Sequence, residues 1–337
     1  MPVRVLLLNN FAQNGQATHV FALGRELSRQ GHRVHLLMPD FPEEYREKYG
    51  KFLDYLGCSV SANDSPEEIA RLLEKYRFDI LHAHSPLTYN LARSLSKACR
   101  APYVLSCHGL GIAGERYEEC LAAAGKLLCI SPRVADSLAR YREKTAIIPN
   151  GIDTREYAPG KKNHPVKILY AGRVDQYKRK GFLALEKALG LCHASSLSFE
   201  YYCAANVSSS FRGAKSLGWV PSIAPYANNS DIIIGTGRAL LEGMAAGNAA
   251  CILGRMWGGV VTPGQVSGRY YFDFSGITGR EACYRNIFFD LAKLMKNTRR
   301  LRELQQFGRD HVLERYDITP HTRQVVKIYE GLVSPGA

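Results

Sequence analysis

The sequence predicts an α/β protein made of two doubly wound domains, each a parallel sheet covered by helices on both faces. Short apolar runs alternate with longer helical patterns along the 337-residue chain, which is typical of parallel sheets. One polar segment, APGKKNHP at residues 158–165, interrupts the alternation, which then begins again. The length also fits about two domains. We therefore expect one domain over residues 1–157 and a second over residues 164–316.

In the first domain, apolar runs predict the strands and amphipathic patterns predict the helices. Strands are expected at residues 3–8, 34–38, 79–82, 103–107, 127–130 and 146–148, with another near Ser59. Helices are expected at residues 18–29, 43–55 and 66–76. Thr18 is the expected N-cap of the first helix, and Gly31 is its expected stop.

The second domain repeats the pattern after the polar segment. Strands are expected at residues 166–171, 197–203, 231–234 and 249–253, and helices at residues 182–191 and 238–246. Helices also fill much of residues 281–333, where Thr319 and Pro320 are expected as N-cap and first helical residue. Two such sheets joined by one linker predict a cleft between their carboxyl ends, where ligands of doubly wound sheets bind.

Charge and cysteine content narrow the possible partners. The formal net charge of +13 favours an anionic partner, such as a phosphorylated substrate or an acidic membrane surface. The cations are scattered and form no long basic arm, so nucleic acid is the weakest candidate. The nine cysteines include no Cys-x-x-Cys pair, so we expect reduced thiols in a cytoplasm and no structural zinc. No apolar run approaches the roughly 20 residues that span a bilayer, which predicts a soluble cytoplasmic protein or one peripheral on the inner membrane face.

The loops after the expected strands contain the residues that suggest chemistry. In the first domain these are Gly15, before the first helix, and His108, at a strand end; an ordinary turn and a structural histidine are the alternatives. His82 and His84 in LHAHS are more simply explained as structural. The run Gly109-x-Gly111-x-x-Gly114 formally matches a dinucleotide fingerprint. It follows a late strand and lacks a ribose-binding acid, so we discount it.

In the second domain, two loops predict a diphosphate site. Arg173 follows the first strand, and cations at residues 178–180 precede the next helix, where they could neutralise a leaving group. Gly235-Thr236-Gly237 opens a later helix, and Glu242 within that helix could accept hydrogen bonds from ribose. The chain has no Asp-x-Asp pair that could hold a divalent metal at the phosphates, so we expect no bound metal. We also expect no cofactor.

In this order and spacing, the motifs NGQATHVFALGRELSRQGHRV, SCHG, CISPRVADSL, IIPNGID, AGRVDQYKRKG and LLEGMAAG resemble the family 4 glycosyltransferases. The resemblance covers nearly the whole chain and implies the GT-B fold, a retaining reaction, an acceptor in the first domain and a nucleotide-sugar donor in the second. It also implies that the last helix, residues 318–333, packs back on the first domain. Lipid-linked sugars, other sugars and small molecules are the acceptor classes that it allows.

The resemblance also implies roles for individual residues. Arg173 and Lys180 match the family's diphosphate-binding pair, although an extra residue between them makes Lys178 a competing assignment. Glu242 matches its ribose-binding acid, His108 its histidine beside the transferred sugar, and Gly15 its first glycine loop. Three further donor contacts are expected more loosely; they are the glycine turn at residues 235–237, Arg238 and Trp219.

One departure from the family is large. The family usually has a second glutamate eight positions before the one that matches Glu242, and here that position is Ile234. Arg238 is a possible substitute. The expected function is transfer of a sugar from a nucleoside-diphosphate sugar to a hydroxyl acceptor. One alternative is a nucleotide-sugar epimerase. The other is a catalytically silent nucleotide-binding homologue, which is favoured by the absence of the second glutamate at position 234.

Overall fold

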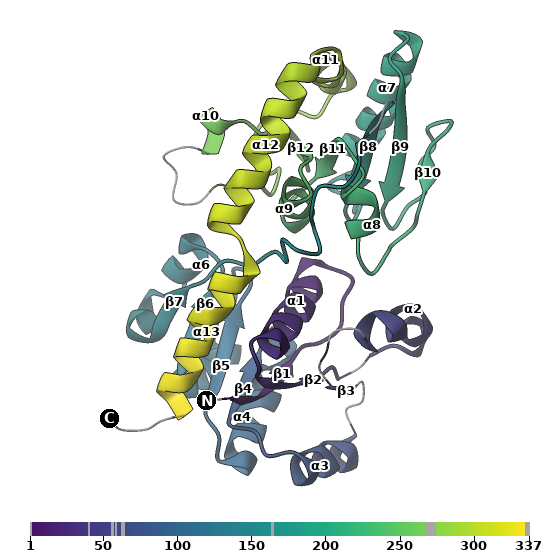
Figure 1. Ribbon diagram of the computed structural model, residues 1–337. Coiled ribbons are helices and arrows are strands. Elements are labelled where there is room, and N and C mark those ends of the chain that lie inside the picture. Colours follow the sequence, from purple (N-terminus) through teal and green to yellow (C-terminus); the bar gives the residue numbers. More distant parts are fainter. Residues whose placement is uncertain are drawn as a thin grey trace. The chain divides into compact units, whose positions relative to one another are not determined.

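The computed structural model describes residues 2–39, 41–54, 57, 59–61, 65–162, 165–266, 272 and 274–333. The chain forms two compact units (Figure 1). Unit 1 comprises Met1–Gly151 and Ile318–Ala337, and unit 2 comprises Ile152–Asp317. The division falls at Gly151, a few residues before the polar segment in which we expect the linker. Residues 163 and 164 of that segment lie outside the described residues.

Unit 1 contains a parallel sheet of seven strands in the order β3-β2-β1-β4-β5-β6-β7. The strands are β1 (Arg4–Leu8), β2 (Arg33–Leu37), β3 (Ser59–Ser61), β4 (Ile80–Ala83), β5 (Tyr103–Cys107), β6 (Lys126–Cys129) and β7 (Thr145–Ile147). The helices are α1 (Gly15–Arg29), α2 (Glu43–Asp54), α3 (Pro66–Lys75), α4 (Tyr89–Cys99), α5 (Glu118–Ala123), α6 (Pro132–Asp136) and α13 (Ile318–Val333). Short 3-10 turns lie at Pro86–Thr88, Glu115–Tyr117 and Ala139–Lys144.

Successive side chains along β4 face opposite sides of the sheet and show how unit 1 covers both of its faces. Leu81 and Ala83 face a core shared with α3, α4 and α5, whereas His82 faces the other side and contacts Tyr329 of α13. Helix α13 packs on α1, so the last helix covers the same sheet as the first helix, as the resemblance implies (Figure 1). Gly151 permits a close approach there, because a Cβ at this position would meet the Cα of Ile318 at 2.7 Å.

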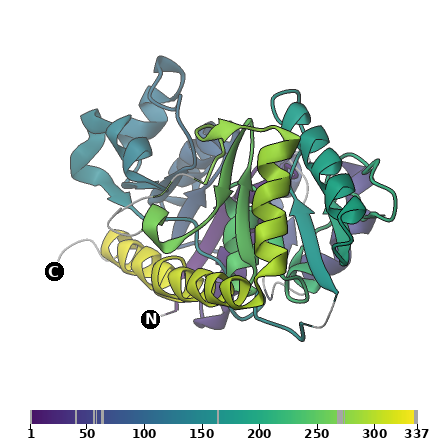
Figure 2. The ribbon, with the colours of Figure 1, turned by 90° about the horizontal axis from the view of Figure 1, so that it is seen from above.

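Unit 2 also has seven strands, in the order β10-β9-β8-β11-β12-β13-β14. The strands are β8 (Val166–Ala171), β9 (Phe199–Ala204), β10 (Lys215–Ser216), β11 (Ile232–Gly235), β12 (Ala249–Leu253), β13 (Met256–Val260) and β14 (Arg280–Glu281). The helices are α7 (Arg179–Ala194), α8 (Ala224–Ala227), α9 (Arg238–Ala245), α10 (Pro263–Val266), α11 (Tyr284–Lys296) and α12 (Thr298–Arg315). Helices α7 and α11 cover one core and α8 and α9 the other, so this sheet is also buried on both faces (Figure 2).

Several local expectations are wrong. Helix α1 begins at Gly15, because the Asn14 side chain caps it by accepting from the amides of Gln16 and Ala17; Thr18 lies inside the helix. Helix α13 begins at Ile318, before the expected cap. Strand β13 is antiparallel to β12, so the second sheet is not purely parallel. The sequence patterns also did not predict α4, α5 and α6. The expected end of α2 at Tyr55 lies outside the described residues.

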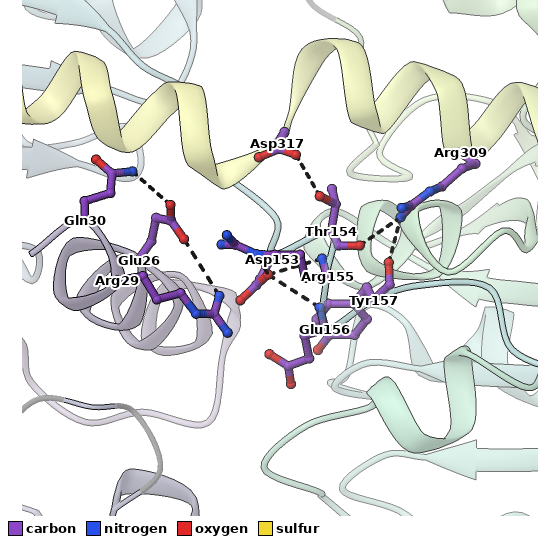
Figure 3. Close-up of polar contacts among 10 residues, drawn as sticks. All are labelled: Glu26, Arg29, Gln30, Asp153, Thr154, Arg155, Glu156, Tyr157, Arg309 and Asp317. Atoms are coloured by element: carbon purple, nitrogen blue, oxygen red, sulfur yellow. Dashed lines mark hydrogen bonds and ion pairs between the residues drawn. The ribbon is translucent and has the colours of Figure 1, made fainter.

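Polar contacts fix the segment that opens unit 2 (Figure 3). The carboxylate of Asp153 accepts from the amides of Arg155 and Glu156, as a turn-forming aspartate does. The guanidinium of Arg309 donates to the carbonyl oxygens of Thr154 and Tyr157 at 3.2 and 2.8 Å. These bonds hold Tyr157 beside α9, where it becomes part of the candidate site.

Candidate nucleotide-sugar site

The carboxyl ends of β8 and β11 come together in unit 2, because these strands pair side by side. Ala171 and Gly235 are register partners, and a Cβ on Gly235 would lie 2.4 Å from the Ala171 carbonyl oxygen. Only glycine therefore fits at 235. Gly237 precedes α9 with a φ of +58°, a conformation that disfavours other residues. The two glycines thus have separate steric reasons to flank Thr236.

Lys178 reaches the glycine turn from the neighbouring loop. Its Nζ donates to Thr236 Oγ1 at 2.9 Å. The carboxylate of Asp175 accepts from the Lys178 amide and shapes the turn before α7. Burial, together with the nearby charge of Arg173, lowers the pKa of Lys178, while Asp175 opposes this shift. Lys178 therefore brings a cation to Thr236, with Arg173 near enough to affect its pKa, at the edge where an anion is expected.

The structure does not bring Lys180 to this turn. The Lys180 Nζ donates to Glu281 Oε1 at 2.8 Å, and both side chains are mostly exposed. Of the two lysines between which the sequence left the assignment open, Lys178 contacts the glycine turn and Lys180 contacts Glu281. The sequence could not decide between them, because the loop holds one residue more than the family pattern and three cations follow one another.

Helix α9 holds Glu242 in a buried polar cluster. Arg238, one turn earlier, donates from Nε to Glu242 Oε1 at 2.8 Å, and only 9% and 7% of the two side chains are exposed. Burial raises the pKa of Glu242 to about 6, although Arg238 and the Tyr157 hydroxyl both counteract the shift. Tyr157 also lies 3.4 Å from Ser222, whose hydroxyl donates to Glu156. Arg238 is thus the ion-pair partner of Glu242. This argues against Arg238 taking the role of the second family glutamate, whose position is Ile234 in this chain.

Two other donor-site expectations concern Ile234 and Trp219. Ile234 is fully buried in β11, where it pairs with Tyr170 and Cys251 and belongs to the core under α7. The position at which the family has its acid is therefore inside the sheet in this chain. Trp219 is half-buried between β10 and α8, next to Gly218, which has a φ of +64°.

In unit 1, His108 belongs to a group of four histidines that the sequence did not reveal as a cluster. Its Nε2 lies 3.3 Å from His84 Nδ1, and the rings of His82 and His84 are 4.0 Å apart. The His19 ring lies 5.6 Å from that of His108. Burial lowers the pKa of His84 well below its usual value and that of His82 to about 3, so both rings are neutral.

His82 is structural, as expected. Its Nδ1 lies 2.5 Å from the Tyr329 hydroxyl and its Nε2 2.8 Å from Ser106 Oγ.

The glycines singled out in unit 1 lie in ordinary local structure. Gly15 is the exposed first residue of α1, without a positive φ. The run from Gly109 to Gly114 leads into a short 3-10 turn, which does not provide the long helix of a dinucleotide site and agrees with our discounting it.

The described residues include no group of three or more histidine, cysteine or carboxylate side chains that could hold a metal ion. Among the same residues, no helix is long and apolar enough to cross a membrane.

The first part of the chain is similar to a known protein family. Residues 13–156 match the family model described as Glycosyltransferase Family 4. A sequence search of curated proteins gives no significant match. The first part of the chain is therefore similar to the family 4 glycosyltransferases, and the chain as a whole has the GT-B fold.

Solved structures with this fold align along nearly the whole chain. A glycosyltransferase from Rickettsia africae is 18% identical with a TM-score of 0.66, and the match covers 99% of this chain and 100% of that one. HepE from Anabaena, in complex with UDP and glucose, is 13% identical with a TM-score of 0.70, covering 98% and 100%. The UDP-GlcNAc 2-epimerase from Neisseria meningitidis, bound to UDP-GlcNAc, is 12% identical with a TM-score of 0.61, covering 96% and 98%.

Proposed function

We propose that the protein transfers a sugar, with retention, from a nucleoside-diphosphate sugar to a hydroxyl group of an acceptor. The contact between Lys178 and Thr236, with Arg173 nearby, carries this proposal. It puts two cations and a helix start at one edge of the unit 2 sheet, where a diphosphate binds in doubly wound folds. The family match and the UDP complex of HepE support the same donor class.

Each residue of the site has a definite part in this proposal. Arg173 and Lys178 neutralise the charge that develops on the departing diphosphate, and the amides after Gly237 add their partial positive charge. Glu242 binds the ribose hydroxyls. A carboxylate has about four lone-pair positions, and Arg238 and Tyr157 use two of them, so two remain for the ribose. Trp219 lies within reach of the base in the family arrangement and is proposed to stack on it.

Unit 1 is proposed to bind the acceptor, with Gly15 and His108 at its carboxyl edge. His108 has a neutral imidazole, His84, beside it, so it can orient a hydroxyl by hydrogen bonding without a competing charge. No divalent metal is needed in this scheme, because lysine, arginine and helix amides provide the positive charge. Turnover that disappears in chelator and returns with magnesium or manganese would refute that part.

An epimerase is the second candidate, and the fold shared with a UDP-GlcNAc 2-epimerase favours it. A silent homologue is the third, because Ile234 replaces an acid. Thermal unfolding against UDP, GDP, ADP and TDP, alone and as sugar conjugates, identifies the base; a ligand at 100 times its Kd stabilises by about 2.7 kcal/mol. The best conjugate is then incubated with and without candidate acceptors.

Acceptor-dependent release of the nucleoside diphosphate establishes transfer. Sugar conversion without acceptor establishes the epimerase, and a nucleotide-induced shift without any turnover of the conjugate supports the silent homologue. Retention is then decided by the anomeric configuration of the product.

A further inference from the structure

A pocket at the opposite end of the unit 2 sheet has no part in the proposed function. It lies at the amino ends of β8 and β11, and its empty space, including the open mouth, is about 490 Å³. Its lining residues are Lys162, Val166, Asp231, Met295, Thr298, Leu301, Arg302 and Gln305. Asp231 precedes β11, and Gly235 ends it. Four residues of extended strand separate these positions by about 13 Å, so the pocket is distinct from the donor edge.

The acidic side chain of the pocket is already engaged. Asp231 is 8% exposed, and its Oδ2 accepts from the Lys167 amide at 2.9 Å. Gln305 Nε2 lies 3.3 Å from Asp231 Oδ1 and 3.1 Å from its carbonyl oxygen. These bonds fix the positions of the Asp231 carboxylate and the Gln305 amide in the lining of the pocket.

The two cations reach the pocket from different segments. Lys162 is half-buried, and its Nζ donates to the carbonyl oxygen of Gly247. Arg302 is on α12, where Glu303 pairs with both Arg299 and Arg300. In the part of the chain that the structure describes, no carboxylate forms an ion pair with Arg302. A solvent-accessible guanidinium that has no carboxylate partner is suited to bind an oxyanion.

The start of α12 adds further donors. The Asn297 side chain caps the amide of Arg300, at 2.9 Å. The amides of Thr298 and Arg299, in the first turn, have no intrahelical acceptor, and the helix dipole favours negative charge beside them. Below this polar rim, Val166, Met295 and Leu301 form an apolar floor.

We propose that this pocket is a second binding site, for a small organic anion with one phosphate or carboxylate head and a compact apolar body. The head binds Arg302, Lys162 and the first turn of α12, and the body lies against Met295 and Leu301. The site is independent of the proposed transfer reaction, because none of its residues belongs to the donor edge.

Met295 makes binding directly observable. Protein with ¹³C-labelled methionine methyl groups is titrated with phenyl phosphate, phenylacetate and phenol in the presence of UDP, and a Met295→Leu variant assigns the signal. The Met295 signal is expected to shift saturably with one or both anions and to stay in place with phenol. Comparison of the two anions distinguishes a phosphate from a carboxylate head.

Two variants complete the test. Arg302→Gln is expected to weaken anion binding by about tenfold or more, because a charged hydrogen bond is lost. Arg300→Gln is the matched control on the same turn, since the Arg300 side chain pairs with Glu303 and does not line the pocket; the anion affinity of this variant is expected to equal that of the wild type. A stationary Met295 signal with both anions, or equal affinities of the two variants, overturns the proposal. The methyl spectrum reports whether each variant is folded. If Arg302→Gln is not folded, Lys162→Gln replaces it, because Lys162 is the other cation assigned to the head.

Discussion

Arg238 and Glu242 lie one turn apart in α9 and form a buried ion pair, with 2.8 Å between Nε and Oε1. Burial costs each charge its hydration, so each depends on the other. In this chain neither residue of the pair can be removed alone without cost to unit 2, and the pair also holds the acid that is proposed to bind ribose.

Replacing Arg238 alone should destabilise unit 2 strongly. Arg238→Met leaves the Glu242 carboxyl buried without its partner, which commonly costs about 3 to 5 kcal/mol in the free energy of unfolding. The double variant Arg238→Met/Glu242→Leu should recover much of this loss, because no charge remains buried. Urea unfolding of both proteins measures the difference. If the single and double variants have the same stability, the pair does not have the energetic role assigned to it.

The placement of Lys178 predicts an asymmetry between two nearby lysines. Lys178→Ala should lower turnover by roughly a hundredfold, as removal of one positioned donor often does. Lys180→Ala serves as the matched control and should change turnover little, because Lys180 pairs with Glu281 at the surface. Steady-state kinetics on both variants decides the assignment, and a greater loss for Lys180→Ala would restore the residue that the family pattern first suggested.

The buried Ile234 predicts weak recognition of the donor's sugar. An ionised hydrogen-bond partner is worth about 1.5 to 3 kcal/mol, and this chain has none at that position. The free nucleoside diphosphate should therefore bind at least as tightly as its sugar conjugate. Glu242→Ala should weaken both equally, since Glu242 is assigned to ribose only. Calorimetry compares the affinities of the wild type and of Glu242→Ala for both ligands. A conjugate that binds the wild type tenfold tighter than the free diphosphate would mean that another residue binds the sugar.

The buried histidines predict lower stability in acid. Burial lowers the folded-state pKa of His82 to about 3 and that of His35 to about 4, from an ordinary value of 6.5. The unfolded chain takes up these protons below pH 6.5 while the folded chain does not, so their contribution is present above pH 6.5 and is lost as the pH falls toward 4. Each histidine adds about 1.4 kcal/mol per pH unit to the slope. Urea unfolding between pH 7 and 4 should show that slope, and His82→Gln should flatten it; an unchanged slope in the variant would contradict the assignment.

The positive charge predicts salt-sensitive association with acidic lipid, as a membrane-linked acceptor would require. The protein should sediment with vesicles that contain phosphatidylglycerol and remain free with neutral phosphatidylcholine, and added salt should release it. Equal binding to both kinds of vesicle, unaffected by salt, would remove the electrostatic argument. The expected cytoplasmic location remains a prediction.

Local patterns in the sequence predicted most of the fold. Apolar runs such as Val166–Ala171 identified buried strands, because a strand covered on both faces is almost continuously apolar. Helix α4 was missed because its residues YNLARSLSKAC mix polar and small side chains and bury few of them. The antiparallel strand β13 was missed because Gly258 and Gly259 weaken its strand pattern.

The candidate site was only partly predictable, for a different reason. Glu242 and the glycine turn belong to one short segment, so their spacing alone brought them together. Lys178 and Thr236 are 58 positions apart, and only the pairing of β8 with β11 shows which lysine reaches the turn. The contact of His82 with Tyr329 joins residues that are 247 positions apart, and no local sequence pattern predicts it.

That long contact has a consequence for how the chain folds during synthesis. Unit 2 is an insertion with adjoining ends, since the Ile152 amide donates to the Tyr316 carbonyl oxygen at 2.7 Å and Ile152 pairs with Asp317. A ribosome therefore completes unit 2 at residue 317, before it has made the last helix of unit 1. Until α13 emerges, the first 151 residues lack the Tyr329 hydroxyl beside His82 and the helix that packs on α1. The unit that begins the chain is thus the last to finish folding, and a truncation at residue 317 should leave unit 2 intact while exposing the apolar surface that α13 covers.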